Sequence, residues 1–255
     1  MRAAAAVIGL LALLLAPLSI ARAGPFSDWS AVVVAGDNRA HSGGPTKAFD
    51  NARRDVAKAL VELGFDQRSI RQLSVRPRRD PTTVVGRADG RTLAESLRAS
   101  ARTTKGCLFY LSSHGSPDGA ILGQELLRPY RLAALLDDAC PDRPTVVVIS
   151  ACFSGVFIPA LQKKDRLILT AARADRASFG CGESDRYPYF DTCFLSSLPG
   201  AHDFAALSAD VQACVARKER ETGAEPASEP QVWIGPALRP LLPLYAFEKP
   251  NLRTP

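Results

Sequence analysis

Two short apolar runs constrain the fold more than any other feature of the chain. Residues 107–111 (Cys-Leu-Phe-Tyr-Leu) and residues 146–149 (Val-Val-Val-Ile) are continuous and carry no charge. Such runs are typical of strands that are buried on both faces of a parallel sheet. Small polar residues follow each run and lead to a reactive side chain, His114 in the first case and Cys152 in the second. Because ligands bind outside the carboxyl ends of such strands, the sequence predicts an imidazole and a thiol at one edge of one sheet.

The remainder of the chain alternates between strand-like and helix-like segments. Four further strands are expected at residues 31–35, 70–73, 167–172 and 231–234. Helices are expected at residues 49–63, 92–101, 129–136, 157–162, 192–198 and 203–221. This alternation predicts an α/β fold with a mostly parallel six-stranded sheet and helices on both faces. We expect a loop over residues 76–91, a small hairpin within residues 120–127, and a Pro-rich tail from Pro236 that is superficial or disordered.

The first 23 residues resemble a secretory signal peptide. Arg2 precedes a charge-free apolar run at residues 3–15, and Ala21-Arg22-Ala23 has the small-x-small form of a signal peptidase site. The run is short for a membrane span, which disfavours the alternative of an uncleaved anchor. We therefore expect a signal peptide at residues 1–23 and one domain at residues 24–255. The protein would be secreted or periplasmic, with no membrane span once the signal is removed.

The charge of the chain does not point to a nucleic-acid partner. The net charge is +6, and loss of Arg2 and Arg22 with the signal would leave +4. The basic residues are scattered or mixed with acids, whereas nucleic-acid binding calls for a larger patch of one sign. We expect no nucleic acid among the partners.

The six cysteines fit an oxidising compartment. If Cys152 stays free, at most two disulfides and one further free thiol remain. Cys107, in an expected buried strand, could be that thiol, and Cys181 and Cys193 could close the loop between them, although spacing does not determine the pairing. The absence of any C-x-x-C pair argues against a zinc or thioredoxin-type site.

The residues around His114 and Cys152 meet the requirements of thiol catalysis. Free cysteine has a pKa near ~8.5 and histidine near ~6.5, so a neighbouring imidazole can act as the base for a thiol nucleophile. The oxyanion of the tetrahedral intermediate needs fixed donors, and the backbone N–H groups of Gly115 and Cys152 are candidates. Ser154-Gly155 would allow a sharp turn after the nucleophile.

Two sequence blocks resemble the active-site blocks of the legumain family of cysteine peptidases, in its bacterial branch. They are Tyr-Leu-Ser-Ser-His-Gly at residues 110–115 and Val-Ile-Ser-Ala-Cys-Phe-Ser-Gly at residues 148–155. Further similar segments lie at residues 33–38, 49–55, 169–175 and 229–235. The legumain family belongs to the caspase-like superfamily, so the resemblance implies a caspase-like three-layer α/β/α sandwich.

The resemblance also implies a reaction. It assigns His114 as general base and acid, Cys152 as nucleophile, Gly115 and Cys152 as the oxyanion hole, and a peptide or protein as the substrate. It implies no metal and no organic cofactor. A transamidase or transpeptidase on the same dyad is an alternative, since the catalytic subunit of the GPI-anchor transamidase is related to legumain. A catalytically silent scaffold that binds peptides is a second alternative. The oligomeric state is left open.

The residues that would select the substrate are less well defined. Legumain has an acidic residue two positions before its cysteine, where this chain has Ser150, and it uses an arginine that our alignment places near Phe49. Ser178 resembles the serine-containing wall of the family's pocket, and Asp191 aligns with a pocket acid. Asp37 and Asn38 follow the first strand in a long Gly/Pro/Asn loop and are further candidates for substrate binding. An unpaired pocket acid would favour Arg or Lys before the scissile bond.

Overall fold

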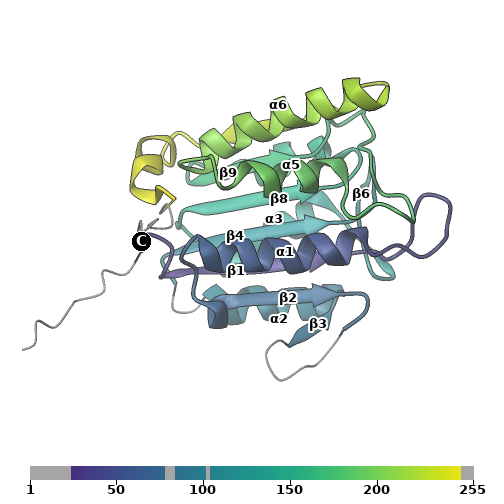
Figure 1. The fold of residues 1–255 in the computed structure, drawn as a ribbon. Coiled ribbons are helices and arrows are strands. Elements are labelled where there is room, and N and C mark those ends of the chain that lie inside the picture. The colour runs from purple at the N-terminus through teal and green to yellow at the C-terminus, as the bar shows by residue number, and fades with distance from the viewer. Residues whose placement is uncertain (1–23, 78–83, 102–103, 248–255) are drawn as a thin grey trace, which may run out of the picture.

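The computed structural model describes residues 24–77, 84–101 and 104–247, and its core is a seven-stranded sheet (Figure 1). The strands of this sheet are β1 (Trp29–Ala35), β2 (Ile70–Ser74), β3 (Val85–Arg87), β4 (Gly106–Ser112), β8 (Thr145–Ser150), β9 (Arg166–Thr170) and β10 (Gln231–Ile234). They are ordered β10-β9-β8-β4-β1-β2-β3. All neighbouring pairs are parallel except β9 and β10, which are antiparallel.

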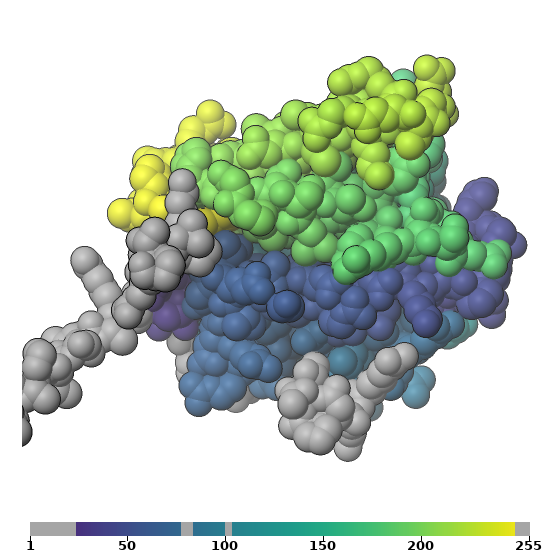
Figure 2. Space-filling model, viewed as in Figure 1, coloured from purple at the N-terminus to yellow at the C-terminus, as the bar shows by residue number. Residues whose placement is uncertain are grey.

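Helices cover both faces of the sheet and make a three-layer sandwich. The helices are α1 (Ala48–Glu62), α2 (Gly90–Ala101), α3 (Pro129–Ala139), α4 (Ile158–Leu161), α5 (Tyr189–Ser197) and α6 (Phe204–Thr222), with short 3-10 turns η1 (Gln67–Ser69), η2 (Ser154–Phe157) and η3 (Arg239–Tyr245). One buried cluster joins the sheet to α1, α5 and α6, and these helices form the face seen in Figure 2. A second cluster joins the opposite face to α2, α3 and α4. No helix among the described residues is long and apolar enough to cross a membrane.

The pattern of burial explains why apolar runs form the central strands. Every residue of β1, β4, β8 and β9 is buried, because helices pack on both faces of these strands. The edge strand β10 is only half-buried along its length. A fully buried strand requires a continuous apolar run, and this is what made the central strands recognisable in the sequence.

The predicted class and the mostly parallel sheet are confirmed, while two details of the strands differ. The sheet has seven strands, because β3 lies in the segment 76–91 that we expected to be a loop. β3 is only three residues long, too short to show a periodic pattern. The hairpin expected near residues 120–127 is part of a separate antiparallel sheet of β5 (Gly115–Ser116), β6 (Gly119–Leu122) and β7 (Glu125–Leu127).

The chain after Pro236 also differs from the prediction. Its 3-10 turn η3 follows β10, and Leu242 and Phe247 are buried against the cluster under α6. Phe247 packs edge-on against Phe204, with ring centroids 4.9 Å apart. The described part of this tail is therefore ordered by aromatic packing, which the proline content of the sequence concealed.

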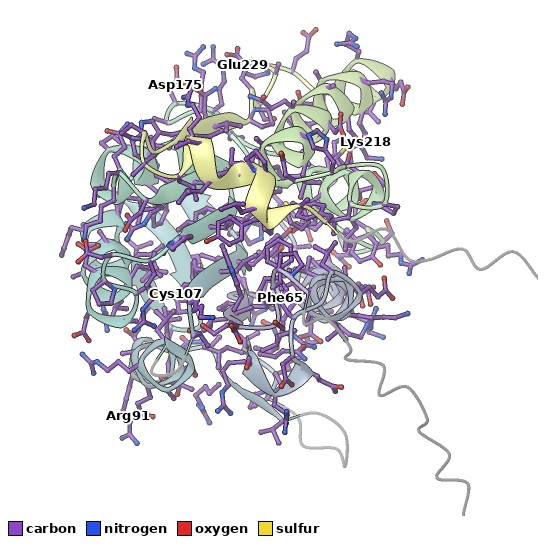
Figure 3. The ribbon with its side chains drawn as sticks, turned by 90° about the vertical axis from the view of Figure 1, so that its left-hand side faces the viewer. Phe65, Arg91, Cys107, Asp175, Lys218 and Glu229 are labelled. Carbon is purple, nitrogen blue, oxygen red and sulfur yellow. A yellow bond between two sulfur atoms is a disulfide. The ribbon has the colours of Figure 1, made fainter. Side chains whose placement is uncertain are left out.

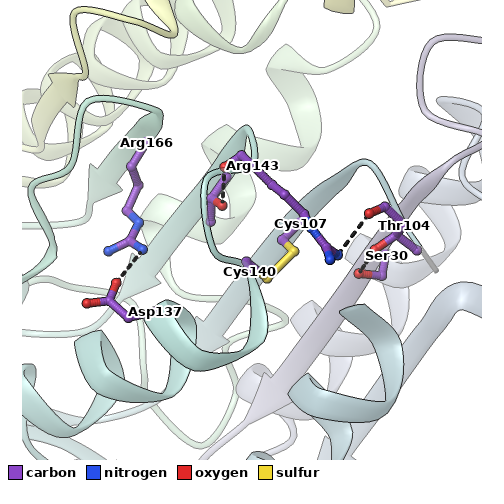
Figure 4. Close-up of a disulfide and its surroundings, with 8 residues drawn as sticks. Ser30, Thr104, Cys107, Asp137, Cys140, Arg143 and Arg166 are labelled. Carbon is purple, nitrogen blue, oxygen red and sulfur yellow. Dashed lines mark hydrogen bonds and ion pairs between the residues drawn. A yellow bond between two sulfur atoms is a disulfide. The ribbon is translucent and has the colours of Figure 1, made fainter. Parts of the chain in front are cut away.

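The disulfides correct the expectation for Cys107. Cys107 on β4 pairs with Cys140 at the end of α3, and Cys193 on α5 pairs with Cys214 on α6. The free cysteines are Cys152 and Cys181, so Cys181 is the additional free thiol and does not pair with Cys193. Cys107 is the second residue of β4 and lies at the amino end of the sheet, the end that faces the viewer in Figure 3. Figure 4 shows its bond to Cys140, beside the contact between Arg166 and Asp137.

Candidate active site

The carboxyl ends of β4 and β8 bring His114 and Cys152 to the same edge of the sheet. The two strands are neighbours, and Ser112 pairs in register with Ser150. His114 and Cys152 each lie two residues beyond this pair, and the N–H of Ser113 continues the pairing by donating to Ser150 O at 3.0 Å. Adjacent strands are about 4.8 Å apart, so the two reactive side chains extend from neighbouring positions.

Two contacts fix the imidazole of His114. Its Nε2 lies 2.9 Å from the backbone oxygen of Arg39, in the loop after β1. A carbonyl oxygen can only accept, so Nε2 carries the hydrogen and Nδ1 of the neutral ring keeps its lone pair. The ring of Phe49, at the start of α1, packs edge-on against the imidazole with centroids 5.0 Å apart. The loop after β1 and α1 therefore set the orientation of the ring and its tautomer.

The thiol of Cys152 is held by the backbone of Ser178. The Ser178 N–H donates to Sγ at 3.2 Å, and Sγ lies 3.5 Å from Ser178 O and 3.6 Å from Ser178 Oγ. The next residue, Phe153, adopts a left-handed conformation with φ of 57°, and its N–H donates to Arg176 O at 2.7 Å. A left-handed non-glycine residue costs about 1–2 kcal/mol, and here it turns the chain sharply from β8 into η2. Such strain next to a reactive thiol is typical of a functional site.

Gly115 allows the backbone after His114 to approach the backbone of Cys152. A Cβ atom at Gly115 would lie 2.1 Å from Cys152 O, so no other residue fits without a shift of the chain. Among the described residues, the N–H of Cys152 makes no hydrogen bond. The two backbone segments therefore meet beside the thiol, and one of their N–H groups is available to an acceptor.

Asp191 and Ser150 lie together beneath this edge of the sheet. The carboxylate of Asp191, on α5, is fully buried and accepts hydrogen bonds from Ser150 Oγ at 2.7 Å, from Ser112 Oγ at 2.9 Å and from the Tyr110 hydroxyl. Burial raises the pKa of Asp191 to about 6, and the three hydroxyl donors oppose that rise. Burial and the nearby carboxylate raise the pKa of Tyr110 far above its ordinary value, so Tyr110 remains a donor. No Lys, Arg or His among the described residues pairs with Asp191.

Asp37 and Asn38 are placed apart from the Asp191 cluster, on the other side of His114. Asp37 Oδ1 accepts from the N–H groups of Asn38 at 2.6 Å and of Arg39 at 3.1 Å. With its amide oxygen turned toward Arg76, Asn38 accepts from Nε at 2.8 Å. These residues line a cavity of about 630 Å³ at the ends of β1, β2 and β3.

Cys181 is a second free thiol near the nucleophile. Burial, together with the nearby Cys152, Asp185 and Asp37, raises the pKa of Cys181 to about 11. Cys181 is therefore a protonated thiol at neutral pH. Within residues 24–77, 84–101 and 104–247, no group of three or more His, Cys, Asp or Glu side chains could hold a metal ion.

Several residues of the site were missed in the sequence. Tyr110 and Ser112 are two residues apart on β4, so their side chains point to the same face of the sheet. Two hydroxyl groups on one face of a buried strand are a signal that could have identified them as partners of a buried acid. The role of Arg39 could not have been found, because its contact uses a backbone oxygen that every residue possesses. Phe49 begins an expected helix and has no sequence feature that links it to the dyad, and the structure places its ring on His114.

Comparisons with known proteins agree with this geometry. Residues 92–213, which include His114 and Cys152, match the sequence profile of the Peptidase C13 family. Among solved structures the fold is similar to that of caspase-1 from Spodoptera frugiperda, with a TM-score of 0.60 and 16% sequence identity over 81% of this chain and 88% of that chain. A comparison with curated protein sequences finds no significant match. The resemblance to the legumain family and the caspase-like α/β fold are thereby confirmed, and the match to the Peptidase C13 family supports a function of the cysteine-peptidase type.

Proposed function

We propose that this protein, with the profile of the Peptidase C13 family over residues 92–213 and a caspase-like fold, is a cysteine endopeptidase. The observation that carries the proposal is the register of β4 and β8, which sets His114 and Cys152 at equivalent positions, two residues beyond the register partners Ser112 and Ser150. A thiol and an imidazole at neighbouring strand ends have the arrangement that nucleophilic acyl transfer needs.

The reaction begins with the thiol of Cys152. Nδ1 of His114 takes the thiol proton, because Nε2 is committed to the oxygen of Arg39. The sulfur then bonds to the carbonyl carbon of the scissile peptide, and the N–H groups of Cys152 and Gly115 receive the oxyanion. His114 next gives its proton to the departing amine, which leaves an acyl-enzyme. Water, deprotonated by the same imidazole, hydrolyses the thioester and frees the thiol.

We propose that Asp191 and Ser150 belong to the pocket for the residue before the scissile bond, together with Ser178. Asp191 is a carboxyl without a basic partner among the described residues, so a lysine or arginine side chain that reached it would supply the missing charge. A peptide library with every residue type at the position before the bond tests this. Cleavage after Arg or Lys is expected, and cleavage only after other residues would reject the assignment.

An active-site alkylating probe tests the enzyme itself. The acyl-transfer mechanism predicts rapid labelling of Cys152 that falls sharply in His114→Ala, where the base is lost. Asp118→Asn, in an exposed turn, is a matched control. Labelling no faster than in Cys152→Ala would reject catalysis and favour a silent peptide-binding scaffold. Mass spectrometry of the products with an added amine distinguishes hydrolysis from transamidation.

We also propose that the protein is exported. The signal-like residues 1–23 lie outside the described residues, but the Cys107–Cys140 and Cys193–Cys214 disulfides support an oxidising compartment such as the periplasm or the extracellular space. Cell fractionation of the full chain, with the N-terminus of the mature protein sequenced, tests this. A mature protein that retains Met1 in the cytoplasm would reject it.

A further inference from the structure

A cavity next to the dyad has no role in the reaction described above. It has a volume of about 630 Å³ and opens at the carboxyl edge of the sheet. Its walls come from three places in the chain: residues 37–39 after β1, Val75 and residues 87–89 at the ends of β2 and β3, and residues 123–125 in the turn between β6 and β7. These segments converge because β1, β2 and β3 are parallel neighbours.

The strand order places this cavity across His114 from the nucleophile. Cys152 follows β8, His114 follows β4, Arg39 follows β1, and the far wall follows β2 and β3, in the order in which the sheet arranges these strands. Arg39 belongs to both sites, because its oxygen accepts from Nε2 of His114 and its residue lines the cavity. The cavity therefore adjoins the Nε2 side of the His114 ring, with Arg39 between them.

The chemistry of acyl transfer indicates which part of a substrate would occupy the cavity. The acyl part of the substrate becomes bonded to Cys152, whereas the departing amine must lie at His114 to receive its proton. The chain that leaves with that amine therefore extends from the His114 side. An extended peptide advances about 3.3 Å per residue, and β1 and β2 lie about 5 and 10 Å from β4. The cavity would hold roughly the second and third residues after the scissile bond.

The charges around the cavity indicate what it selects. Each carboxylate of the wall is already bonded within the protein. Asp37 accepts from two backbone N–H groups, Asp89 Oδ1 from the Thr92 N–H at 2.8 Å, and Glu125 from the Gly90 N–H and Arg131, both at 3.0 Å. Glu125 is paired with Arg131, and Asp37 and Asp89 hold backbone N–H groups that shape the wall, so Arg39 and Arg87 are the cationic groups of the lining that a ligand can engage.

Arg39 and Arg87 are exposed, and neither forms an ion pair with a carboxylate of the described residues. The guanidinium of Arg39 donates only to the neutral backbone oxygen of Gly43, at 3.0 Å, and the charge of Arg87 lowers the pKa of Asp89 without an ion pair between them. Two guanidinium groups without a carboxylate partner in the described part of the chain favour an anionic group in the ligand.

We propose that this cavity binds the leaving-group side of a polypeptide substrate, and that Arg39 and Arg87 select an acidic side chain at the second or third position after the scissile bond. The proposal rests on the proposed peptidase function. It assigns a ligand to a cavity that the acyl-transfer chemistry leaves unused, and it adds a specificity element remote from the thiol.

Internally quenched peptides test the assignment. They share the preferred sequence before the scissile bond and carry Glu, Gln or Lys at the second and third positions after it. We expect kcat/KM for the Glu peptide to exceed that for the Gln peptide by about tenfold, and that for the Lys peptide by more. In Arg87→Gln and Arg39→Gln the Glu-to-Gln ratio should fall toward one, and Arg87→Glu should turn the preference toward Lys.

Arg71→Gln is the matched control, because Arg71 is an exposed arginine of β2 that does not line the cavity. It should keep the wild-type ratio. A ratio of one in the wild type, a preference for Lys, or an equal ratio in wild type and Arg87→Gln would overturn the assignment. A peptidyl coumarin amide, which has no residues after the scissile bond, separates the two proposals. If it is cleaved while the peptides show no preference, only the cavity assignment fails; if neither substrate is cleaved, the peptidase proposal fails.

Discussion

Replacement of the buried acid by its amide, Asp191→Asn, should change how stability depends on pH. In the folded protein, burial raises the pKa of Asp191 to about 6, against 3.8 as the reference value. The native state therefore binds this proton more tightly than the unfolded state. The resulting stabilisation is fully present below the unfolded pKa and is lost as the pH rises through the folded pKa.

The size of the effect follows from the two pKa values. One pKa unit corresponds to about 1.4 kcal/mol, so the full difference between the states is about 3 kcal/mol. Between about pH 4.5 and about pH 7.5 the part that is lost is about 2 kcal/mol. The asparagine side chain does not titrate in this range, and its amide can still bond to the hydroxyls of Ser112, Ser150 and Tyr110. The stability difference is the free energy of unfolding of the wild type minus that of Asp191→Asn. This difference should be about 2 kcal/mol larger at about pH 4.5 than at about pH 7.5.

Urea unfolding curves at the two pH values, followed by circular dichroism with the disulfides intact, measure this difference. Asp118→Asn, in the exposed turn between β5 and β6, is the control for removing an acid from the surface. A difference that stays constant within about 0.5 kcal/mol, or that changes in the opposite direction, would refute the reasoning. It would mean that the three hydroxyl donors, and not burial, dominate the energy of the carboxylate.

Three further outcomes follow from contacts in and around the site. In Gly115→Ala, a Cβ 2.1 Å from Cys152 O must displace the backbone, so kcat/KM should fall about 100-fold or more while the protein stays folded; activity within a few fold of wild type would contradict the close approach. At pH 8, iodoacetamide should modify Cys181, with its pKa of about 11, about tenfold or more slowly than a free model thiol, as measured by mass spectrometry in Cys152→Ala; equal rates would contradict its burial. Replacing Cys193 and Cys214 by Ala removes a disulfide between residues that are 21 positions apart in the chain, and it should lower the free energy of unfolding in urea by about 3 kcal/mol. An unchanged urea midpoint would contradict that estimate.

The sequence determined the central strands and the position of the His114 imidazole and the Cys152 thiol at the edge of the sheet. A strand covered on both faces must be apolar at nearly every position, so β1, β4, β8 and β9 appear as continuous runs. The carboxyl ends of parallel strands lie at one edge, so the strand pattern alone predicts that His114 and Cys152 lie at the same edge of the sheet. Only the local pattern and the geometry common to all parallel sheets are needed for that prediction.

The tertiary structure alone decided what surrounds these residues. The sequence predicted Asp37, Asn38, Ser150, Ser178 and Asp191 as one group of substrate-binding candidates. The structure separates Asp37 and Asn38 from the other three, since the order of β1, β4 and β8 in the sheet sets them on opposite sides of His114. Strand order follows from how the whole chain packs, and no local pattern records it.

The same holds for the contacts that involve no characteristic residue type. The oxygen of Arg39 fixes the tautomer of His114, and the backbone of Ser178 holds the sulfur of Cys152. Cys107 has the sequence context of a buried free thiol, and only the packing of α3 on the sheet brings Cys140 to it. Local sequence thus identified the imidazole and the thiol as candidates for the chemistry. Long-range packing decided which partners fix their orientation, because backbone groups and disulfide partners are chosen by proximity in space and not by position in the chain.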